Sequence, residues 1–303
     1  MPREQMKDRP GLVVAAHGRR GVLEADGRRH PFILKGRGLR VVCGDRVRFE
    51  ARAGSEALLV TAIEPRSNAL ARLHTRTRRE EVIAANISQL IAVCAPQPGP
   101  DPFLLDRYAC AAEVLGCRFA LVWNKGDLER QVAGSPAELA GLGYPLLVTS
   151  TLTGDGLDEL AGQLAGQTTV LAGQSGVGKS SLVNALFAGT DAAVGELSAA
   201  TATGTHTTTA VVMYSREPGI RLLDTPGVRQ FLPSVRSDQH LYRGFREMYG
   251  PAADCRFSNC RHTHEPGCAV RASVAAGSIS ARRYASYCQL LATLDDGEPR
   301  PAR

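Results

Sequence analysis

The sequence predicts a protein of three parts: a small all-β barrel, a central α/β domain and a mostly helical C-terminal domain. Three observations lead to this prediction. Short strand-like segments crowd residues 11–64, strand and helix patterns alternate from about residue 87, and helical patterns with clustered cysteines follow residue 232. Closely spaced short strands favour a barrel, whereas alternating strands and helices favour a parallel sheet.

Composition limits the class of protein. The chain has 303 residues, of which 44% are hydrophobic and 22% charged, as in ordinary globular proteins. Eight cysteines are too few for a disulfide scaffold, and the best apolar run, Leu90–Ala95, is far too short to span a bilayer. The first residues, MPREQMKDRP, contain no apolar signal region. We therefore expect a cytoplasmic protein with reduced thiols and no membrane partner.

The N-terminal region indicates a barrel that binds a polyanion. Five segments alternate or run apolar between turn signals, at residues 11–16, 20–25, 30–36, 46–51 and 57–64. We predict an OB-like barrel over 1–66, although an SH3-like or Tudor-like barrel fits this pattern almost as well. Residues 1–80 carry 18 Lys and Arg against 9 Asp and Glu, which favours RNA as partner. An Arg-rich basic linker is expected over 67–85.

A phosphate-binding loop follows the apolar strand TTVLAG. The segment GQSGVGKS matches the pattern G-x-x-x-x-G-K-[ST], and a helical segment begins at its lysine. Glycines let successive N–H groups point at phosphates, Lys179 reaches the β and γ phosphates, and the Ser180 hydroxyl ligates Mg²⁺. The predicted phosphate-binding residues are Gly173, Gln174, Ser175, Gly176, Val177, Gly178, Lys179, Ser180 and Ser181.

Two further segments complete a triphosphate site. Asp224 ends the apolar strand IRLLD, and the following DTPG motif places Gly227 where its N–H can meet a γ-phosphate. Residues 195–209 form a candidate switch, in which a threonine completes the Mg²⁺ shell only when a triphosphate is bound. We favour Thr208 over Thr207 as that ligand.

Selection of the base is assigned to the motif Asn124-Lys125-Gly126-Asp127, which follows a buried strand. The Asp127 carboxylate can accept hydrogen bonds from guanine N1–H and the 2-amino group, which adenine lacks. Asn124 can bridge the base edge and the phosphate loop, and the Lys125 stem can stack over the ring. Ser150 and Thr151 end another strand, where a backbone N–H can reach guanine O6.

The order of these motifs is unusual, because the base-selecting segments precede the phosphate loop. A sheet keeps its spatial arrangement when its chain is cut and rejoined at the surface. We therefore predict a circularly permuted P-loop GTPase domain over residues 86–232.

The C-terminal residues 233–303 contain four candidate ligands of a structural metal ion, namely Cys255, Cys260, His262 and Cys268. Three thiolates and one imidazole favour tetrahedral Zn²⁺, with no position left open for catalysis. His264 lies close enough to replace His262 as a ligand. We predict a helical domain folded around one zinc ion.

Taken together, the motifs NKGD, GQSGVGKSSL, GTHTTT, DTPGV and Cys-x4-Cys-x-His-x5-Cys closely resemble the ribosome small-subunit-dependent GTPase family, called RsgA, YjeQ or EngC. The similarity covers residues 10–295. It implies an OB domain, a permuted GTPase domain and a zinc domain. It also implies hydrolysis of GTP to GDP and phosphate, stimulated by the 30S subunit, during late maturation of that subunit in the cytoplasm. Nothing in the sequence demands a dimer, and we expect a monomer.

Hydrolysis without the ribosome is expected to be slow. Ras-like enzymes orient water with a glutamine after the DxxG glycine, whereas this chain has Val228 there. We hypothesise that His206 orients the attacking water once the ribosome orders the switch. Three other functions stay open at this point: an RNA-binding module in which hydrolysis is incidental, an ATP-dependent P-loop protein, and a DNA-binding zinc-finger regulator.

Overall fold

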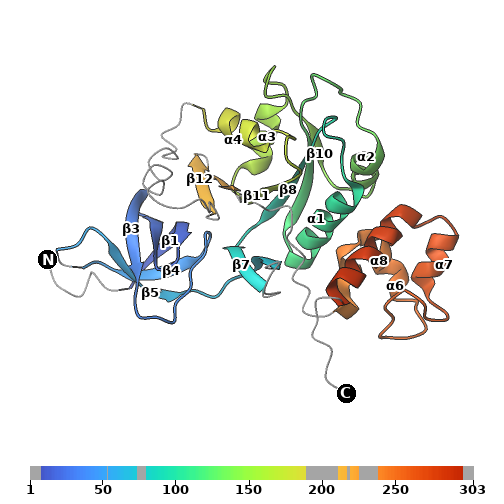
Figure 1. Cartoon of the computed structure of the whole chain (residues 1–303), viewed down its shortest axis with the longest axis horizontal. Coiled ribbons are helices and arrows are strands. Elements are labelled where there is room, and N and C mark those ends of the chain that lie inside the picture. The colour runs from blue at the N-terminus through green and yellow to red at the C-terminus, as the bar shows by residue number, and fades with distance from the viewer. Residues whose placement is uncertain are drawn as a thin grey trace.

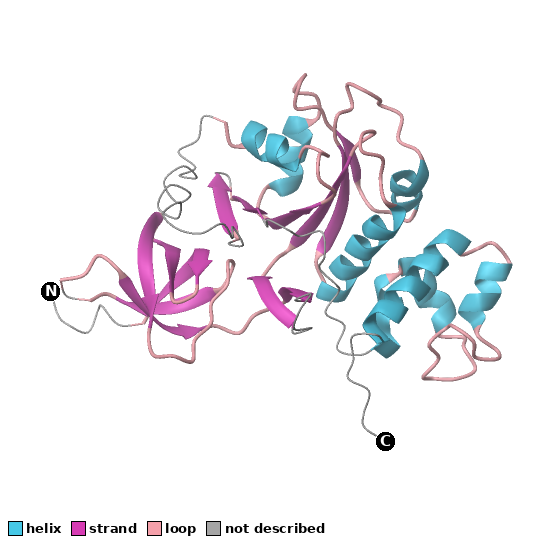
Figure 2. Ribbon diagram, viewed as in Figure 1, coloured by secondary structure: helices cyan, strands magenta, loops and turns pink. Residues whose placement is uncertain are grey.

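The computed structural model describes residues 8–52, 54–73, 80–188, 211–216, 219–224 and 238–295. Figure 1 shows a blue N-terminal barrel, a green and yellow α/β domain and an orange to red helical C-terminal domain. In Figure 2 the strands gather in the first two parts and the helices in the last two. Within the described residues no helix is both long and apolar enough to cross a membrane.

The N-terminal part is a closed five-stranded barrel. Its strands are β1 (Arg9–His17), β2 (Arg20–Ala25), β3 (Arg28–Leu34), β4 (Arg46–Glu50) and β5 (Leu58–Ile63). β1 pairs with both β2 and β4, β3 pairs in parallel with β5, and β5 pairs with β4, which closes the OB arrangement. Alternate residues point inward, so that Val47 and Phe49 of β4 are buried.

The stretch expected to be a basic linker contains a β-ribbon instead. Strands β6 (Ala69–Leu73) and β7 (Glu80–Ala85) pair in an antiparallel fashion. Arg66 donates to both carboxylate oxygens of the buried Asp45 at 2.7 and 2.8 Å. Asn86 Nδ2 donates to the carbonyl of Gly44, and Asn68 Nδ2 donates to the carbonyl of Leu115. Side-chain hydrogen bonds therefore attach this connection both to the barrel and to the central domain.

The central domain is built on a mainly parallel sheet. Its strands are β8 (Gln89–Cys94), β9 (Arg118–Trp123), β10 (Leu146–Val148), β11 (Thr168–Ala172), β12 (Val212–Arg216) and β13 (Ile220–Asp224). They lie in the order β10-β9-β8-β11-β13-β12, and only β12 runs antiparallel to its neighbour β13. The helices are α1 (Pro102–Leu115), α2 (Gly134–Gly141), α3 (Leu157–Leu164) and α4 (Lys179–Leu186).

Helices cover both faces of this sheet, and the strand pattern reflects it. Every residue of β8 is buried. Leu90 and Ala92 belong to the core beneath α1 and α2, whereas Ile91 and Val93 belong to the core beneath α3 and α4. Such a continuous apolar strand is typical of a parallel sheet between two helical layers. The barrel joins the free edge of this sheet through one pairing, Ala15 with Val212.

The C-terminal domain packs on α1. It contains the 3₁₀ helix η3 (Asp238–Gly244) and helices α6 (Arg246–Ala252), α7 (Ala269–Ala275) and α8 (Ala281–Asp295). Phe245 and Tyr287 share a buried cluster with Cys110 of α1. A Cβ atom at Gly244 would lie 2.3 Å from the Cys110 sulfur, so only glycine permits this close approach. Figure 1 shows α8 lying beside α1.

Candidate functional site

The phosphate loop spans the turn from β11 to α4. Gly178 has φ of +94°, and a Cβ atom there would lie 2.2 Å from the Asn124 amide nitrogen. Gly173 would bring a Cβ atom to 2.3 Å from the Val93 carbonyl oxygen. Lys179 Nζ donates to the carbonyls of Gly173 and Gln174, each at 2.7 Å. The ammonium thus lies across the loop at a helix N-terminus, an arrangement that holds anions in proteins.

Asn124 connects the segment Asn124–Asp127 to this loop. It is 1% exposed, and its Nδ2 donates to the Val177 carbonyl at 2.9 Å. Its Oδ1 accepts a hydrogen bond from the Thr149 hydroxyl at 3.1 Å. Lys125 has φ of +60°, and its Nζ donates to the Gln97 carbonyl at 2.7 Å. Two stretches about 50 residues apart in the chain therefore form one continuous site.

The Ser150 turn holds the carboxylate of Asp127. The Ser150 hydroxyl donates to Asp127 Oδ1 at 2.5 Å. The Ser150 Oγ atom itself accepts hydrogen bonds from the N–H groups of Leu152 and Thr153, each at 3.2 Å. Asp127 itself is exposed, so its second carboxylate oxygen can meet a purine edge from solvent.

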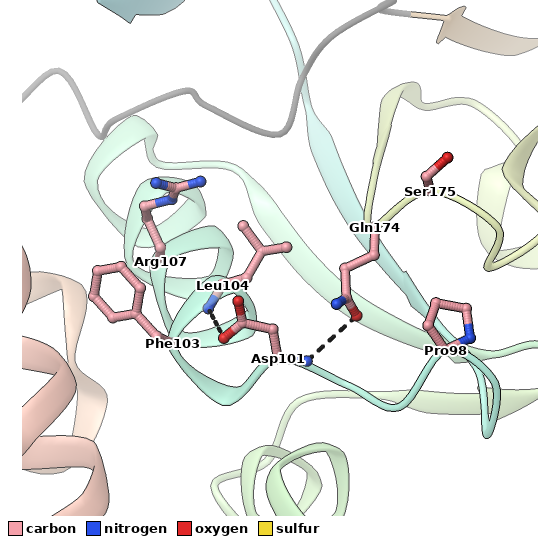
Figure 3. Close-up of a pocket in the computed structure, with 7 residues that line it drawn as sticks. All are labelled: Pro98, Asp101, Phe103, Leu104, Arg107, Gln174 and Ser175. Carbon is pink, nitrogen blue, oxygen red and sulfur yellow. Dashed lines mark hydrogen bonds between the residues drawn. The ribbon is translucent and has the colours of Figure 1, made fainter.

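A cavity of about 420 Å³ lies between the phosphate loop and the N-terminus of α1. Figure 3 shows the Gln174 side chain directed toward Asp101, whose backbone N–H donates to Gln174 Oε1 at 3.3 Å. The Asp101 carboxylate caps α1 by accepting from the Leu104 N–H. The remaining lining residues are Pro98, Phe103, Leu104, Arg107 and Ser175. The first turn of α1 is therefore attached to the phosphate loop.

The four sequence-predicted metal ligands come together in the C-terminal domain. The sulfur atoms of Cys255, Cys260 and Cys268 and a ring nitrogen of His262 all lie within 4.8 Å of one another. His262 Nδ1 faces the sulfurs of Cys255 and Cys268 at 3.4 and 3.6 Å, whereas its Nε2 is buried without a hydrogen-bond partner. Nδ1 is therefore the nitrogen placed to bind a metal ion.

The surrounding residues hold the metal-binding loop in shape. Tyr284 donates to the His262 carbonyl and Tyr287 to the Arg261 carbonyl, both at 2.7 Å. The Glu265 carboxylate accepts three backbone N–H groups of this loop, at 2.9 to 3.1 Å. His264, the alternative ligand, contacts the Thr263 hydroxyl and is not part of the cluster.

Comparison with known proteins gives a consistent result. The family model described as RsgA GTPase matches residues 63–232. This chain belongs to the RsgA GTPase family. The small ribosomal subunit biogenesis GTPase RsgA of Pseudomonas aeruginosa is 40% identical over 95% of this chain and 86% of its own length. That of Ectopseudomonas mendocina is 41% identical over 85% of this chain and 76% of its own length.

Two solved structures share the whole architecture. The crystal structure of YjeQ from Thermotoga maritima superposes with a TM-score of 0.72 at 28% identity, covering 95% of this chain and 98% of that one. The structure of YloQ, described as a circularly permuted GTPase, gives a TM-score of 0.68 at 25% identity, covering 99% of this chain and 100% of that one. As an RsgA GTPase, the chain hydrolyses GTP, and its motif order is permuted.

The permutation leaves the site intact because the sheet order is preserved. β8 lies between β9, which leads to Asn124, and β11, which leads to the phosphate loop. Both loops therefore start at the same edge of neighbouring parallel strands, where ligands bind in α/β sheets. The backbone of Asp224 ends β13, the strand on the other side of β11, at this same edge. The side chain of Asp224, and all of His206, Thr208 and Gly227, lie outside the described residues.

Several residues that shape the two sites were not found by motif analysis. Thr149 orients Asn124, Gln97 receives Lys125, and the tyrosines of α8 support the metal loop. Thr149 had a readable signal, because it directly follows strand β10 and precedes Ser150. Gln97 accepts the hydrogen bond through its backbone carbonyl. Every residue type has this group, so the sequence could not single out Gln97.

Proposed function

We propose that this chain binds the 30S ribosomal subunit through 16S rRNA and couples GTP hydrolysis to late subunit maturation and to its own release. The relatives from Ectopseudomonas mendocina and Pseudomonas aeruginosa are named as GTPases of small ribosomal subunit biogenesis. The observation that carries the proposal is that the relative from Pseudomonas aeruginosa matches 95% of this chain at 40% identity, a span that reaches into all three domains.

The proposed recognition of GTP gives each group of site residues one role. Asp127, held by Ser150, accepts the two donors of the guanine edge, and Thr151 offers its N–H to O6. The N–H groups of Gly173–Ser181 and the ammonium of Lys179 surround the phosphates. Ser180, with Thr208 and Asp224, holds Mg²⁺, which neutralises charge on the β and γ phosphates. His206 orients the attacking water, because Val228 cannot do so.

The Cys/His cluster fits a structural zinc ion. Three soft thiolates and an imidazole nitrogen supply four ligands of the type that zinc prefers. His262 Nδ1 faces the Cys255 and Cys268 sulfurs at 3.4 and 3.6 Å, which supports this nitrogen as the fourth ligand. The ion contributes folding free energy to a domain with a small core of its own.

The barrel supplies a cationic surface for RNA. Its exposed Lys and Arg side chains are Arg9, Arg19, Arg20, Arg28, Lys35, Arg37, Arg40, Arg46 and Arg52. Binding to phosphates through such residues releases counterions, so affinity for the subunit falls steeply as salt is raised. The chain acts as a monomer in the cytoplasm.

The decisive experiment is the GTPase rate with purified 30S subunits, with 50S subunits as control. We expect stimulation of roughly tenfold or more by 30S alone, or about 1.4 kcal/mol of barrier. Equal GTPase rates with and without 30S subunits would contradict the proposed stimulation. If the chain then still bound 30S subunits only in the presence of GTP, it would be a nucleotide-gated RNA-binding module. Equal affinity for ATP and GTP would contradict the guanine assignment. Preference for DNA over the 30S subunit would contradict the proposed partner.

A further inference from the structure

The barrel is attached to the rest of the chain at two places of unequal strength. The stronger one is the contact with the end of the β6–β7 ribbon. There the Ala85 N–H donates to the Cys43 carbonyl at 3.0 Å, and Asn86 Nδ2 donates to the Gly44 carbonyl at 2.9 Å. A Cβ atom at Gly44 would lie 2.1 Å from the Ala85 carbonyl oxygen, so backbone packs directly on backbone.

The weaker attachment lies between the barrel and β12, the edge strand of the central sheet. One pairing, Ala15 with Val212, joins the two, and Figure 1 shows β12 beside the barrel. Arg29 Nη2 of β3 donates to the Met213 carbonyl at 3.4 Å, near the upper limit for a hydrogen bond. Met213 is 1% exposed and belongs to the same buried cluster as Val14 of β1. The junction thus combines a small apolar contact with a long polar one.

Glu24 and Arg221 add a charged contact to this junction. Arg221 Nη2 of β13 lies 4.0 Å from Glu24 Oε1, and the two side chains are 44% and 25% exposed. The strand register places Glu24 of β2 directly opposite Arg29 of β3. One carboxylate therefore neighbours two arginines that reach across the junction. Ion pairs this long and this exposed add little stability, so the contact can break and re-form readily.

Strand β12 connects this junction with the triphosphate site. Val212 pairs with Ala15 on one side and with the backbone of Asp224 on the other. Asp224 is a proposed Mg²⁺ residue, and the candidate switch 195–209 precedes β12 in the sequence. Because the ribbon contact is the firmer one, a force on the barrel would displace the β12 contact first. Such a displacement would reach the backbone beside Asp224 through a single paired strand.

We propose that Arg29 and Glu24 are positioning residues through which RNA bound to the barrel accelerates GTP hydrolysis. The inference rests on the proposed stimulation by the 30S subunit and deepens it by naming the contact that transmits the effect. Neither side chain belongs to the nucleotide site, so hydrolysis without RNA does not depend on them. Arg28 is exposed and binds RNA phosphates, whereas its neighbour Arg29 is half-buried and contacts β12.

The test compares Arg29→Ala with Arg28→Ala in the full-length, metal-loaded chain, using purified 30S subunits. For Arg29→Ala we expect an unchanged Kd for the subunit and an unchanged kcat in its absence, whereas kcat at saturating 30S falls roughly tenfold. For Arg28→Ala we expect the reverse, with roughly threefold weaker binding but full stimulation at saturation. Arg29→Lys can still donate to the Met213 carbonyl and should retain most of the stimulation.

A second variant covers the case in which Arg29→Ala folds poorly. Glu24→Gln keeps the shape of the side chain and removes the charge that faces both arginines. It should also lower kcat at saturating 30S, with the Kd for the subunit and the thermal unfolding midpoint unchanged. Asp26→Asn is the matched control, because Asp26 lies in the exposed turn between β2 and β3. This substitution should leave the stimulation as it is.

The outcomes separate this role from the proposed function. If Arg29→Ala and Glu24→Gln are stimulated like the unaltered protein, the two residues do not transmit the effect, although the proposed function stands. If Arg29→Ala loses affinity for 30S subunits as Arg28→Ala does, Arg29 belongs to the RNA surface and its positioning role is overturned. A fall in kcat without subunits overturns it too, because the residue would then support the nucleotide site itself. If 30S subunits do not stimulate the unaltered protein, the proposed function fails, and this role fails with it.

Discussion

Arg283 Nη1 donates to Asp106 Oδ1 at 2.7 Å, and both side chains are 1% exposed. Arg283 also binds both carboxylate oxygens of Glu247, at 2.7 and 2.9 Å. The adjacent Arg282 donates to Asp106 Oδ2 at 2.7 Å and to Glu138. Helix α8 is thus tied to α1, α2 and α6, so that one buried ionic network joins the metal-binding domain to the GTPase domain.

Asp106→Asn should destabilise this junction strongly. The substitution keeps the shape of the side chain but removes the negative charge shared by two arginines, one of which has no access to water. Loss of one partner from a buried ion pair costs about 3–5 kcal/mol. We expect a loss in this range in the free energy of unfolding, measured by urea titration of the metal-loaded protein.

The exposed pair Arg130–Asp155 provides the control. Its atoms lie 3.0 Å apart, but the side chains are 72% and 53% exposed. Solvent screens such a pair, and Asp155→Asn should change stability by less than about 1 kcal/mol. Similar effects of the two substitutions would show that the buried network does not hold the domains together.

Thr149→Val tests the orientation of Asn124. Valine has nearly the same shape but cannot donate to Asn124 Oδ1. Losing one buried hydrogen bond of about 1 kcal/mol should raise the Kd of GDP roughly fivefold, with kcat unchanged. Thr293→Val is the control, because that hydroxyl donates to the Gln289 carbonyl at an exposed position of α8, and it should leave the Kd unaltered. An unchanged Kd in Thr149→Val would mean that Asn124 is positioned by Val177 alone.

Gly178→Ala should abolish nucleotide binding. The new methyl group would meet the Asn124 amide at 2.2 Å, and φ of +94° is unfavourable for alanine. Gly162→Ala is the matched control, because that glycine lies in α3 with no atom near its Cβ position. There alanine should stabilise the protein by about 1 kcal/mol, through its higher helix propensity. Detectable GDP binding by Gly178→Ala in equilibrium dialysis would contradict the close approach of the two loops.

The sequence predicted well those features that depend on local pattern. The phosphate loop needs its glycines at fixed spacings within eight residues, and the metal-binding cluster has its thiols within 14 residues, so both could be read from spacing. The reach of Asn124 to the phosphate loop was also expected, because a buried strand places it at the right edge of the sheet. Its amide donates to the Val177 carbonyl.

Features that depend on distant contacts were not predictable in this way. Asp106 and Arg283 are 177 residues apart, and each reads as an ordinary surface charge on a helix. Strands β6 and β7 lie in the segment expected to be a basic linker. Both strands are short and an Arg-rich segment separates them, so the sequence pattern does not reveal their antiparallel pairing. Side chains acting on backbone groups, such as Tyr284 on the His262 carbonyl, carry no motif at all.

Metal removal should expose three thiols and leave the deeply buried ones unreactive. Burial raises the pKa of the Cys94 thiol to about 12, so at pH 8 it is protonated and shielded from reagents. A bound metal ion would hold the three cysteines of the cluster, and a chelator that removes the ion would free them. The number of cysteines that react with a chromogenic thiol reagent should therefore rise by three per chain after chelation, with one equivalent of zinc released.

Cys288→Ser, outside the cluster, should leave this difference unchanged, whereas Cys260→Ser should bind little metal. If all three cluster thiols react before the chelator is added, in protein purified without chelator and supplied with zinc, they are not metal ligands.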